Sequence, residues 1–285
     1  MVATIGFFDG VHLGHQQVLK RLVEVANIQN DKSIVITFAE HPQPDMPLLT
    51  TLAERKQMIY ASGVNIVHIL DFPTIRHLTA QQFMHNVLHN QLHVNTLLMG
   101  YDHRFGSDRI NDFHTYKALG EKENIHIICL SQFAPQGKHI SSSVIRNLIE
   151  QGDIDRANQL LGYNFSITGT VTQGRHIGRQ IGFPTANILP SDSKKIIAGA
   201  GVYVADVYIQ DSRQPIRSML NIGTNPTVGG KHQTIEVHLI NYNDNLYSKN
   251  LRIEILHRLR GEIHFRTLEE LSRQLSIDKT DVMAY

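Results

Sequence analysis

The sequence has a single cysteine, Cys129, so no disulfide bond can form within the chain. Cys129 stands in the apolar run 127–130 (IICL), which predicts a small buried side chain rather than a reactive thiol. No run approaches the about 18 apolar residues that a membrane-spanning helix needs. The first residues (MVATIGFFDG) lack the basic start and apolar core of a signal peptide, so we expect a cytoplasmic protein without a membrane partner.

The chain also has little net charge, because 27 Lys and Arg against 26 Asp and Glu leave +1. A nucleic-acid backbone requires a concentrated basic surface, so this balance argues against a nucleic-acid partner. A small anionic ligand remains compatible, because one local cluster of donors is enough to bind it. Hydrophobic residues make up 41% and charged residues 19% of the chain, which is typical of a globular protein.

The first half of the chain alternates apolar runs with stretches of helical periodicity. The predicted strands are residues 2–8, 33–38, 64–70, 96–99 and 125–130, and predicted helices begin near residues 14, 51 and 79. Strands that alternate with helices predict a parallel sheet with helices on its faces. Residues 144–150 and 154–161 predict two further short helices.

The second half has a different apolar period, which changes from about 3.6 to about 2. Its predicted strands are residues 165–172, 202–209, 216–222, 234–240 and 251–256, joined by segments rich in Gly, Asn, Asp and Pro. This pattern predicts a small antiparallel barrel or sandwich, followed by a closing helix that starts at Thr267. The length of 285 residues suits about two domains, and we place them at residues 1–162 and 163–285.

Residues 9–15 (DGVHLGH) follow a predicted strand and open a predicted helix. The free N–H groups at a helix start favour an anion, and Gly10 and Gly14 let the backbone approach it closely. His12 and His15 are three residues apart, so they share a helical face and can donate hydrogen bonds to phosphates. The alternative is a pair of solvated histidines, which the coincidence of strand, glycine turn and helix start disfavours.

Residues 6–15 (GFFDGVHLGH) resemble the start of the nucleotidyltransferase module of bacterial bifunctional riboflavin kinase/FMN adenylyltransferases, also called FAD synthetases. Similar family motifs follow in order at residues 37–42 (TFAEHP), 100–106 (GYDHRFG) and 140–146 (ISSSVIR). The resemblance implies a Rossmann-like fold in which His12 and His15 grip the phosphates of ATP. It also implies nucleotide, phosphate or flavin contacts for Gly10, Gly14, His41, Asp102, Ser142, Ser143 and Arg146.

The segment 140–146 has a physical interpretation of its own. Ser142 or Ser143 can cap a helix that begins near Val144, and Arg146 then lies close to N–H groups that favour a phosphate. An ordinary N-cap with a surface arginine is the alternative. The reaction implied by the resemblance is attack of the FMN phosphate on the α-phosphorus of ATP, in which the protein aligns the reactants and stabilises charge.

Residues 169–187 (GTVTQGRHIGRQIGFPTAN) contain spaced glycines, among them Gly174 and Gly178. Such glycines can form a loop over phosphates, although ordinary turns give similar patterns. The whole segment resembles the riboflavin kinase signature that ends in Pro-Thr-Ala-Asn. The resemblance implies that Thr185 and Asn187 hold Mg²⁺ and ATP phosphates, and their oxygen atoms suit a hard cation.

Residues 234–239 (TIEVHL) alternate apolar and polar side chains, which puts Glu236 on the face opposite Ile235 and Val237. By itself this pattern is compatible with a solvated strand residue. By resemblance, Glu236 is the base that accepts the proton of the riboflavin 5′-hydroxyl. Residues 221–227 (NIGTNPT) are similar to a turn of the family, and Arg260 begins a segment that resembles its flavin-side loop.

The expected architecture is therefore an N-terminal Rossmann-like nucleotidyltransferase domain and a C-terminal antiparallel β-barrel riboflavin kinase domain with a closing helix. The implied substrates and products are riboflavin, FMN, FAD and ATP, with Mg²⁺ as cofactor. Two alternatives remain open: only one live activity, or a non-catalytic flavin or nucleotide sensor. His85, His89 and His93 share a helical spacing, and we interpret them as a solvated face rather than a zinc site.

Overall fold

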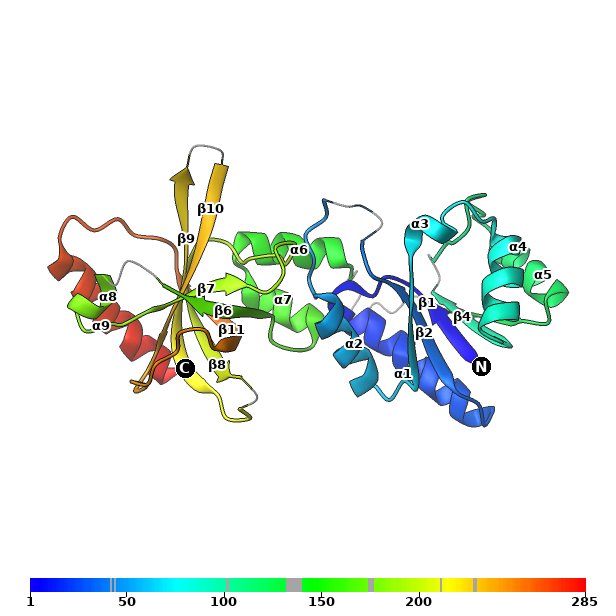
Figure 1. The fold of residues 1–285 in the computed structure, drawn as a ribbon, viewed down its shortest axis with the longest axis horizontal. Helices are drawn as coiled ribbons and strands as arrows, with labels where there is room; N and C mark the ends of the chain where they lie inside the picture. Colours follow the sequence, from blue (N-terminus) through cyan, green and yellow to red (C-terminus); the bar gives the residue numbers. More distant parts are fainter. Residues whose placement is uncertain are drawn as a thin grey trace. The chain divides into compact units, whose positions relative to one another are not determined.

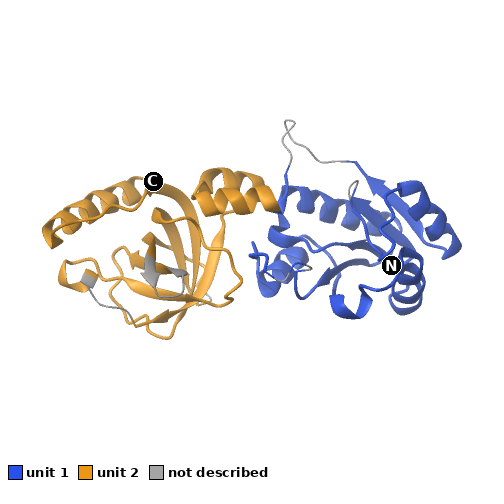
Figure 2. Cartoon of the chain, turned by 90° about the horizontal axis from the view of Figure 1, so that it is seen from above, with its two compact units in different colours: residues 1–142 blue, residues 143–285 orange. Residues whose placement is uncertain are grey.

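A computed structural model gives the fold of this protein. It describes residues 1–41, 43, 45–100, 103–131, 140–173, 177–210, 212–227 and 230–285. The chain forms two compact units, Met1–Ser142 and Ser143–Tyr285 (Figure 2). The first contains a parallel five-stranded sheet and the second a closed antiparallel barrel (Figure 1), so the predicted fold classes are confirmed.

The sheet of the first unit has the strand order β3-β2-β1-β4-β5, and all its strands are parallel. The strands are β1 (Val2–Ile5), β2 (Ser33–Phe38), β3 (Ile66–Leu70), β4 (Thr96–Gly100) and β5 (His126–Leu130). Every residue of β1 and β2 is buried, as expected for parallel strands covered on both faces. The predicted strand 2–8 is too long, because the chain leaves the sheet after Ile5 and turns into the short helix η1 (Asp9–Val11).

Helices cover both faces of this sheet. On one face, α1 (Leu13–Ile28) and α2 (Leu52–Ala61) pack through Leu22 and Ile59 against Val35. The other face is covered by α4 (Ala80–Phe83), its π-helical continuation η2 (Met84–Gln91) and α5 (Phe113–Lys122). The short helix α3 (Phe72–Ile75) follows β3. This arrangement leaves the carboxyl ends of β1 and β2 available for a site.

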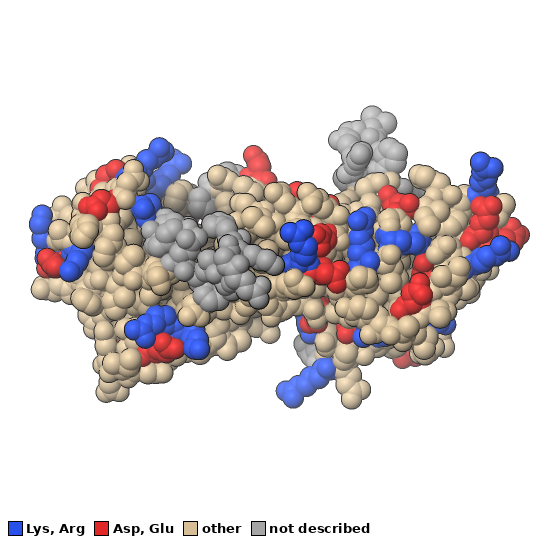
Figure 3. All heavy atoms as spheres, turned by 180° about the vertical axis from the view of Figure 1, so that it is seen from behind, with Lys and Arg blue, Asp and Glu red and all other residues tan. Residues whose placement is uncertain are grey.

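The prediction for Cys129 was wrong, because its side chain is exposed. Among the described residues, β5 pairs with β4 alone and is the edge strand of the sheet. Within the described residues, no helix combines the length and apolar character needed to cross a bilayer. On the face shown in Figure 3, basic and acidic side chains are interspersed, in keeping with the near-neutral sequence.

The barrel of the second unit has the closed order β10-β7-β6-β11-β8-β9, with antiparallel neighbours. Its strands are β6 (Ser166–Thr172), β7 (Ala186–Pro190), β8 (Gly201–Ile209), β9 (Ile216–Thr227), β10 (Gly230–Leu239) and β11 (Asn250–Arg260). Its helices are α6 (Ser142–Gln151), which starts at the last residue of the first unit, α7 (Ile154–Leu161), α8 (Ile177–Gln180) and α9 (Leu268–Ala284). The sequence pattern missed β7, because this short strand buries only Ile188.

Hydrogen bonds join α6 and α7 to the barrel, which explains why most of this segment belongs to the second unit. The Asn158 side chain donates to the Ile255 carbonyl (2.9 Å) and accepts from the Phe165 N–H (2.8 Å). The Arg258 guanidinium donates to the carbonyls of Gln151 (3.3 Å) and Ala200 (2.7 Å). The predicted domain boundary between residues 162 and 163 lies where the apolar periodicity of the sequence changes. It stays a prediction about where the second module begins.

The final helix α9 covers one outer face of the barrel. Its Val282 is fully buried and clusters with Met219 of β9, Val202 of β8 and Phe183 of the segment before β7. A helix can only lie outside a closed six-stranded barrel, so the side chains of Met219 and Val202 mark the outer face of these strands. This assignment decides the side of the barrel on which the second site lies.

Candidate functional site

The first candidate site begins with a tight turn after β1. Phe8 (φ 57°), Gly10 (φ 78°) and Val11 (φ 34°) all have left-handed backbone angles, which residues other than glycine rarely adopt. The buried Asp9 carboxylate accepts hydrogen bonds from the N–H groups of Leu49 (3.0 Å) and Thr50 (2.9 Å). Backbone strain of this kind occurs at functional sites and persists only where the surroundings enforce it.

The structure brings the predicted histidines together at the start of α1. His12 is the N-cap residue, its Nδ1 accepts a hydrogen bond from the His15 N–H (3.3 Å), and the two rings stack 3.6 Å apart. Because Nδ1 accepts, the proton of a neutral His12 is on Nε2 and can be donated to a ligand. A Cβ on Gly14 would lie 3.2 Å from the His12 ring, so this glycine leaves room for it.

His12 is buried and His15 is half-buried, but the Nδ1 atom of His15 is enclosed. This atom is shielded from solvent and has no hydrogen-bond partner among the described residues. Burial lowers the pKa of His15 well below its usual value, and the charges of His12 and Arg55 act in the same direction. His15 is therefore neutral at neutral pH, and it can offer a hydrogen bond to a phosphate rather than a full positive charge.

Arg55 belongs to this site and was missed by the sequence analysis. Its side chain is fully buried, donates from Nη2 to the Phe38 carbonyl (2.6 Å) and lies 4.1 Å over the Phe7 ring. Burial lowers its pKa to about 10, while Asp9 acts in the opposite direction, so Arg55 stays protonated at neutral pH. The available signal was its spacing of four from Ile59, since these two are the buried residues of α2.

His41 and Ser142 each contact the segment that follows β1. The His41 ring meets the Phe7 ring edge-on at 4.7 Å, and its Nδ1 accepts from the Gln43 N–H (3.0 Å). α6 begins at Ser142, so neither Ser142 nor Ser143 is its N-cap, contrary to the prediction. The Ser142 hydroxyl instead donates to the Asp9 carbonyl (3.0 Å), which ties this segment to the strained turn.

Arg146 is buried in α6 and belongs to the second unit. Asp102 and Gly174 lie outside the described residues. Their proposed contacts with nucleotide or flavin therefore stay predictions.

The second candidate site lies on the barrel, where Thr185, Asn187 and Glu236 come together. Asn187 of β7 pairs directly with Glu236 of β10, which places both side chains on the same face. The Thr185 hydroxyl donates to Glu236 Oε2 at 3.0 Å. A hydroxyl, an amide and a half-buried carboxylate thus converge at one point of the sheet.

The strand register extends this site into a polar row. Thr172 pairs with Asn187, Asn187 with Glu236, and Glu236 with Asn221 of β9. Asn221 also pairs with Val202, so the row lies on the outer face of the barrel. The predicted strand 216–222 contains Asn221, but its alternation between the buried Leu220 and Ile222 was not interpreted as a site position. β9 also continues to Thr227, through the segment that resembles a turn of the family.

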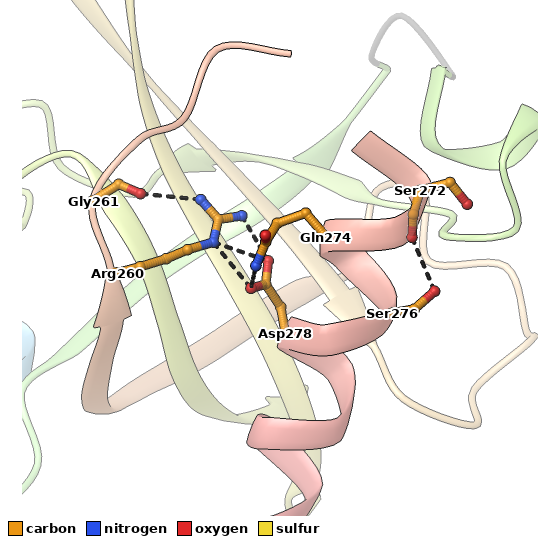
Figure 4. A network of polar contacts seen from close by, with 6 residues as sticks. All are labelled: Arg260, Gly261, Ser272, Gln274, Ser276 and Asp278. Atoms are coloured by element: carbon orange, nitrogen blue, oxygen red, sulfur yellow. Dashed lines mark hydrogen bonds and ion pairs between the residues drawn. The ribbon is translucent and has the colours of Figure 1, made fainter. Parts of the chain in front are cut away.

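Gly178 and Arg260 have structural partners in the second unit. The Phe183 N–H donates to the Gly178 carbonyl (2.8 Å), and a Cβ on Gly178 would collide with the Phe183 carbonyl oxygen. Arg260 donates from Nε (3.0 Å) and Nη2 (2.6 Å) to Asp278 of α9, which also accepts from Gln274 (Figure 4). Gly178 therefore shapes the turn before Thr185, and Arg260 anchors α9.

Mg²⁺ fits the second site by the chemistry of its donors. The Thr185 hydroxyl, the Asn187 amide and the Glu236 carboxylate supply oxygen atoms, which a hard cation prefers. In the part of the chain that the structure describes, no group of three or more His, Cys, Asp or Glu side chains could hold a metal. Such a site suits an ion held mainly by phosphate oxygens, as Mg²⁺ is in kinases. Of the three histidines 85, 89 and 93 that share a helical spacing, His85 contacts a carboxylate: its Nδ1 lies 2.7 Å from Glu123 Oε2.

Known relatives match nearly the whole chain. Residues 1–144 match the FAD synthetase family model, and residues 161–285 match the riboflavin kinase model. The bifunctional riboflavin kinase/FMN adenylyltransferase of Buchnera aphidicola subsp. Schizaphis graminum is 34% identical, covering 99% of this chain and 93% of its own. The protein of the same name from Escherichia coli K12 is 35% identical, covering 98% of this chain and 90% of its own.

A solved structure shares the fold along the same length. It is titled as a macrolide-efflux protein from Streptococcus pneumoniae, has a TM-score of 0.91 and 30% identity, and covers 100% of this chain and 94% of its own. Neither matched family model carries the efflux activity of that title. The two family models and the full-length curated relatives agree, and the chain belongs to the bifunctional riboflavin kinase/FMN adenylyltransferase family.

Proposed function

We propose that this protein phosphorylates riboflavin to FMN with ATP and adenylylates FMN to FAD with release of pyrophosphate. The observation that carries the kinase half is the 3.0 Å hydrogen bond from Thr185 to Glu236, with Asn187 paired directly opposite that carboxylate. The adenylyltransferase half rests on the stacked His12 and His15 at the start of α1.

In the kinase reaction, Glu236 accepts the proton of the riboflavin 5′-hydroxyl as that oxygen attacks the γ-phosphorus of ATP. The Thr185 hydroxyl occupies one carboxylate oxygen of Glu236, so the other can face the substrate hydroxyl. Thr185 and Asn187 would hold Mg²⁺ and the phosphates. Bound Mg²⁺ neutralises charge on the phosphate oxygens. Gly174 and Gly178 belong to the segment that we place over the phosphates.

In the adenylyl transfer, the FMN phosphate attacks the α-phosphorus of ATP. This nucleophile is already an anion, so the site needs no activating base and acts by alignment and charge stabilisation. His12 and His15 donate hydrogen bonds, and the N-terminus of α1 and the buried Arg55 supply positive potential. We assign further nucleotide or flavin contacts to Gly10, Gly14, His41, Asp102, Ser142, Ser143 and Arg146.

The kinase module starts at residue 163, which the family match beginning at residue 161 supports. A cytoplasmic location suits a reaction that consumes ATP. The flavin-side role of Arg260 stays a prediction, and its bonds to Asp278 already give it a structural role.

A time course with riboflavin, ATP and Mg²⁺ tests this function. Chromatography of the flavins should show FMN first and FAD later, with both lost when EDTA removes the divalent ion. If FMN is the final product, only the kinase activity is live. If FAD forms only when FMN is supplied, only the adenylyltransferase activity is live. Flavin binding without either product would indicate a sensor and contradict the proposal.

A further inference from the structure

His238 is a buried histidine in the second unit that the proposed reaction does not use. It follows Glu236 by two residues on β10, so both side chains leave the strand on the same face. It pairs with Met219, which marks the outer face covered by α9. Only 6% of His238 is exposed, so this imidazole is enclosed between the barrel and the segments that cover it.

The contacts of His238 fix its tautomer. Nδ1 lies 2.8 Å from the Pro184 carbonyl oxygen, which can only accept a hydrogen bond. The proton of the neutral ring is therefore on Nδ1. The Phe183 ring packs against the imidazole with centroids 5.5 Å apart and an interplanar angle of 62°. His238 thus holds both the side chain of Phe183 and the main chain of Pro184.

These contacts connect His238 to the kinase site through one residue. Pro184 immediately precedes Thr185, whose hydroxyl donates to Glu236 at 3.0 Å. β10 therefore holds the segment at consecutive residues: His238 binds the carbonyl of residue 184, and Glu236 accepts the hydroxyl of residue 185. Thr185 itself is exposed, so its own burial contributes little to its position.

We propose that His238 is a positioning residue of the kinase site, which fixes the Pro184 carbonyl and thereby sets the Thr185 hydroxyl for Mg²⁺ and ATP. This inference rests on the proposed kinase function. The charge state agrees with it: burial lowers the pKa of His238, Lys279 of α9 acts in the same direction, and the hydrogen bond to Pro184 opposes them. A charged ring would lie buried near Lys279, whereas a neutral ring keeps its donor without that repulsion.

Paired substitutions test the role. His238→Leu removes the donor at similar volume, whereas His238→Asn keeps an N–H donor near the position of Nδ1. We expect His238→Leu to raise the KM for MgATP about tenfold, the effect of losing one hydrogen bond, while the KM for riboflavin stays unchanged. His238→Asn should recover most of this loss. His257→Leu is the matched control, because that histidine of β11 instead pairs with Asp155.

The assay distinguishes failure of the positioning role from failure of the proposed kinase function. If the wild-type chain does not phosphorylate riboflavin, the proposed function fails. If it does, an unchanged KM for MgATP in His238→Leu, or an equal defect in His238→Asn, overturns the positioning role. FAD formation from supplied FMN should stay at the wild-type rate, which shows that the first unit is intact, and an unchanged KM for riboflavin shows that the mutated second unit is folded. Ring ¹⁵N shifts of wild-type His238 give a second test, because a proton on Nε2 instead of Nδ1 also contradicts the proposal.

Discussion

At the scale of residues, both sites depend on buried groups with a defined charge. His15 and His238 have pKa values lowered mainly by burial, so each is a neutral hydrogen-bonding group at neutral pH. Arg55 stays charged, although burial lowers its pKa to about 10. A fixed cation beside a neutral imidazole gives the first site positive potential without two adjacent full charges.

The two neutral histidines predict a loss of stability in acid. Their folded pKa values lie below the unfolded value of about 6.5, so the unfolded chain takes up protons that the folded chain does not. Their contribution is complete above about pH 6.5 and is lost as the pH falls toward the folded pKa values, at up to about 1.4 kcal/mol per pH unit for each histidine. Urea unfolding at about pH 7.5 and about pH 5.5 measures this loss.

The variant His238→Asn provides the control, because asparagine does not titrate. Its unfolding free energy should fall less between the two pH values than that of the wild type. Lys279 faces His238 from α9 and stays protonated throughout this range, so it does not contribute to the difference. An equal fall in both proteins would show that folding does not lower the pKa of His238.

Residues that carry their signal in local sequence could be predicted, and those defined by distant contacts could not. The spacing of His12 and His15 placed them on one face, and the alternation around Glu236 placed it opposite the core. Arg55 was missed because its neighbours Phe7 and Phe38 lie far away in sequence. The role of Asn221 depends on the register between β9 and β10, which composition does not reveal.

At the scale of elements, strong periodic signals gave correct boundaries. The predicted strand 33–38 is β2, and the helix predicted to begin near residue 79 does so with a complete capping box between Thr79 and Gln82. The closing helix predicted from Thr267 is capped by the Thr267 hydroxyl, which accepts from the Glu270 N–H, while the Glu270 carboxylate accepts from the Arg266 N–H. The short strand β7 depends on pairing with β6 and β10 rather than on its own pattern.

The attachment of α9 to the barrel predicts a measurable stability effect. Asp278 is 1% exposed and holds the Arg260 guanidinium, so Asp278→Asn leaves a half-buried cation without its counter-charge. We expect the unfolding free energy of the second unit to fall by about 3 kcal/mol. Urea unfolding, followed by the loss of riboflavin phosphorylation, measures this change. The matched variant Asp281→Asn lies on an exposed position of the same helix and should change this transition little. Equal stability of both variants would contradict an anchoring role for the ion pair.

At the scale of the whole molecule, each compact unit contains its own candidate site. The stacked histidines lie within Met1–Ser142, and Thr185, Asn187 and Glu236 lie within Ser143–Tyr285. The family models match the same two parts of the chain. We therefore expect the chemistry of each activity to depend on side chains of one unit.

Reciprocal variants assayed for each activity separately test this claim most directly. Glu236→Gln should abolish FMN formation from riboflavin and leave FAD formation from supplied FMN at the wild-type rate, because it removes the base while keeping the shape. His15→Ala should sharply lower FAD formation, by about a hundredfold, and leave FMN formation intact. The account predicts this crossed pattern, and simultaneous loss of both activities in either folded variant would contradict it.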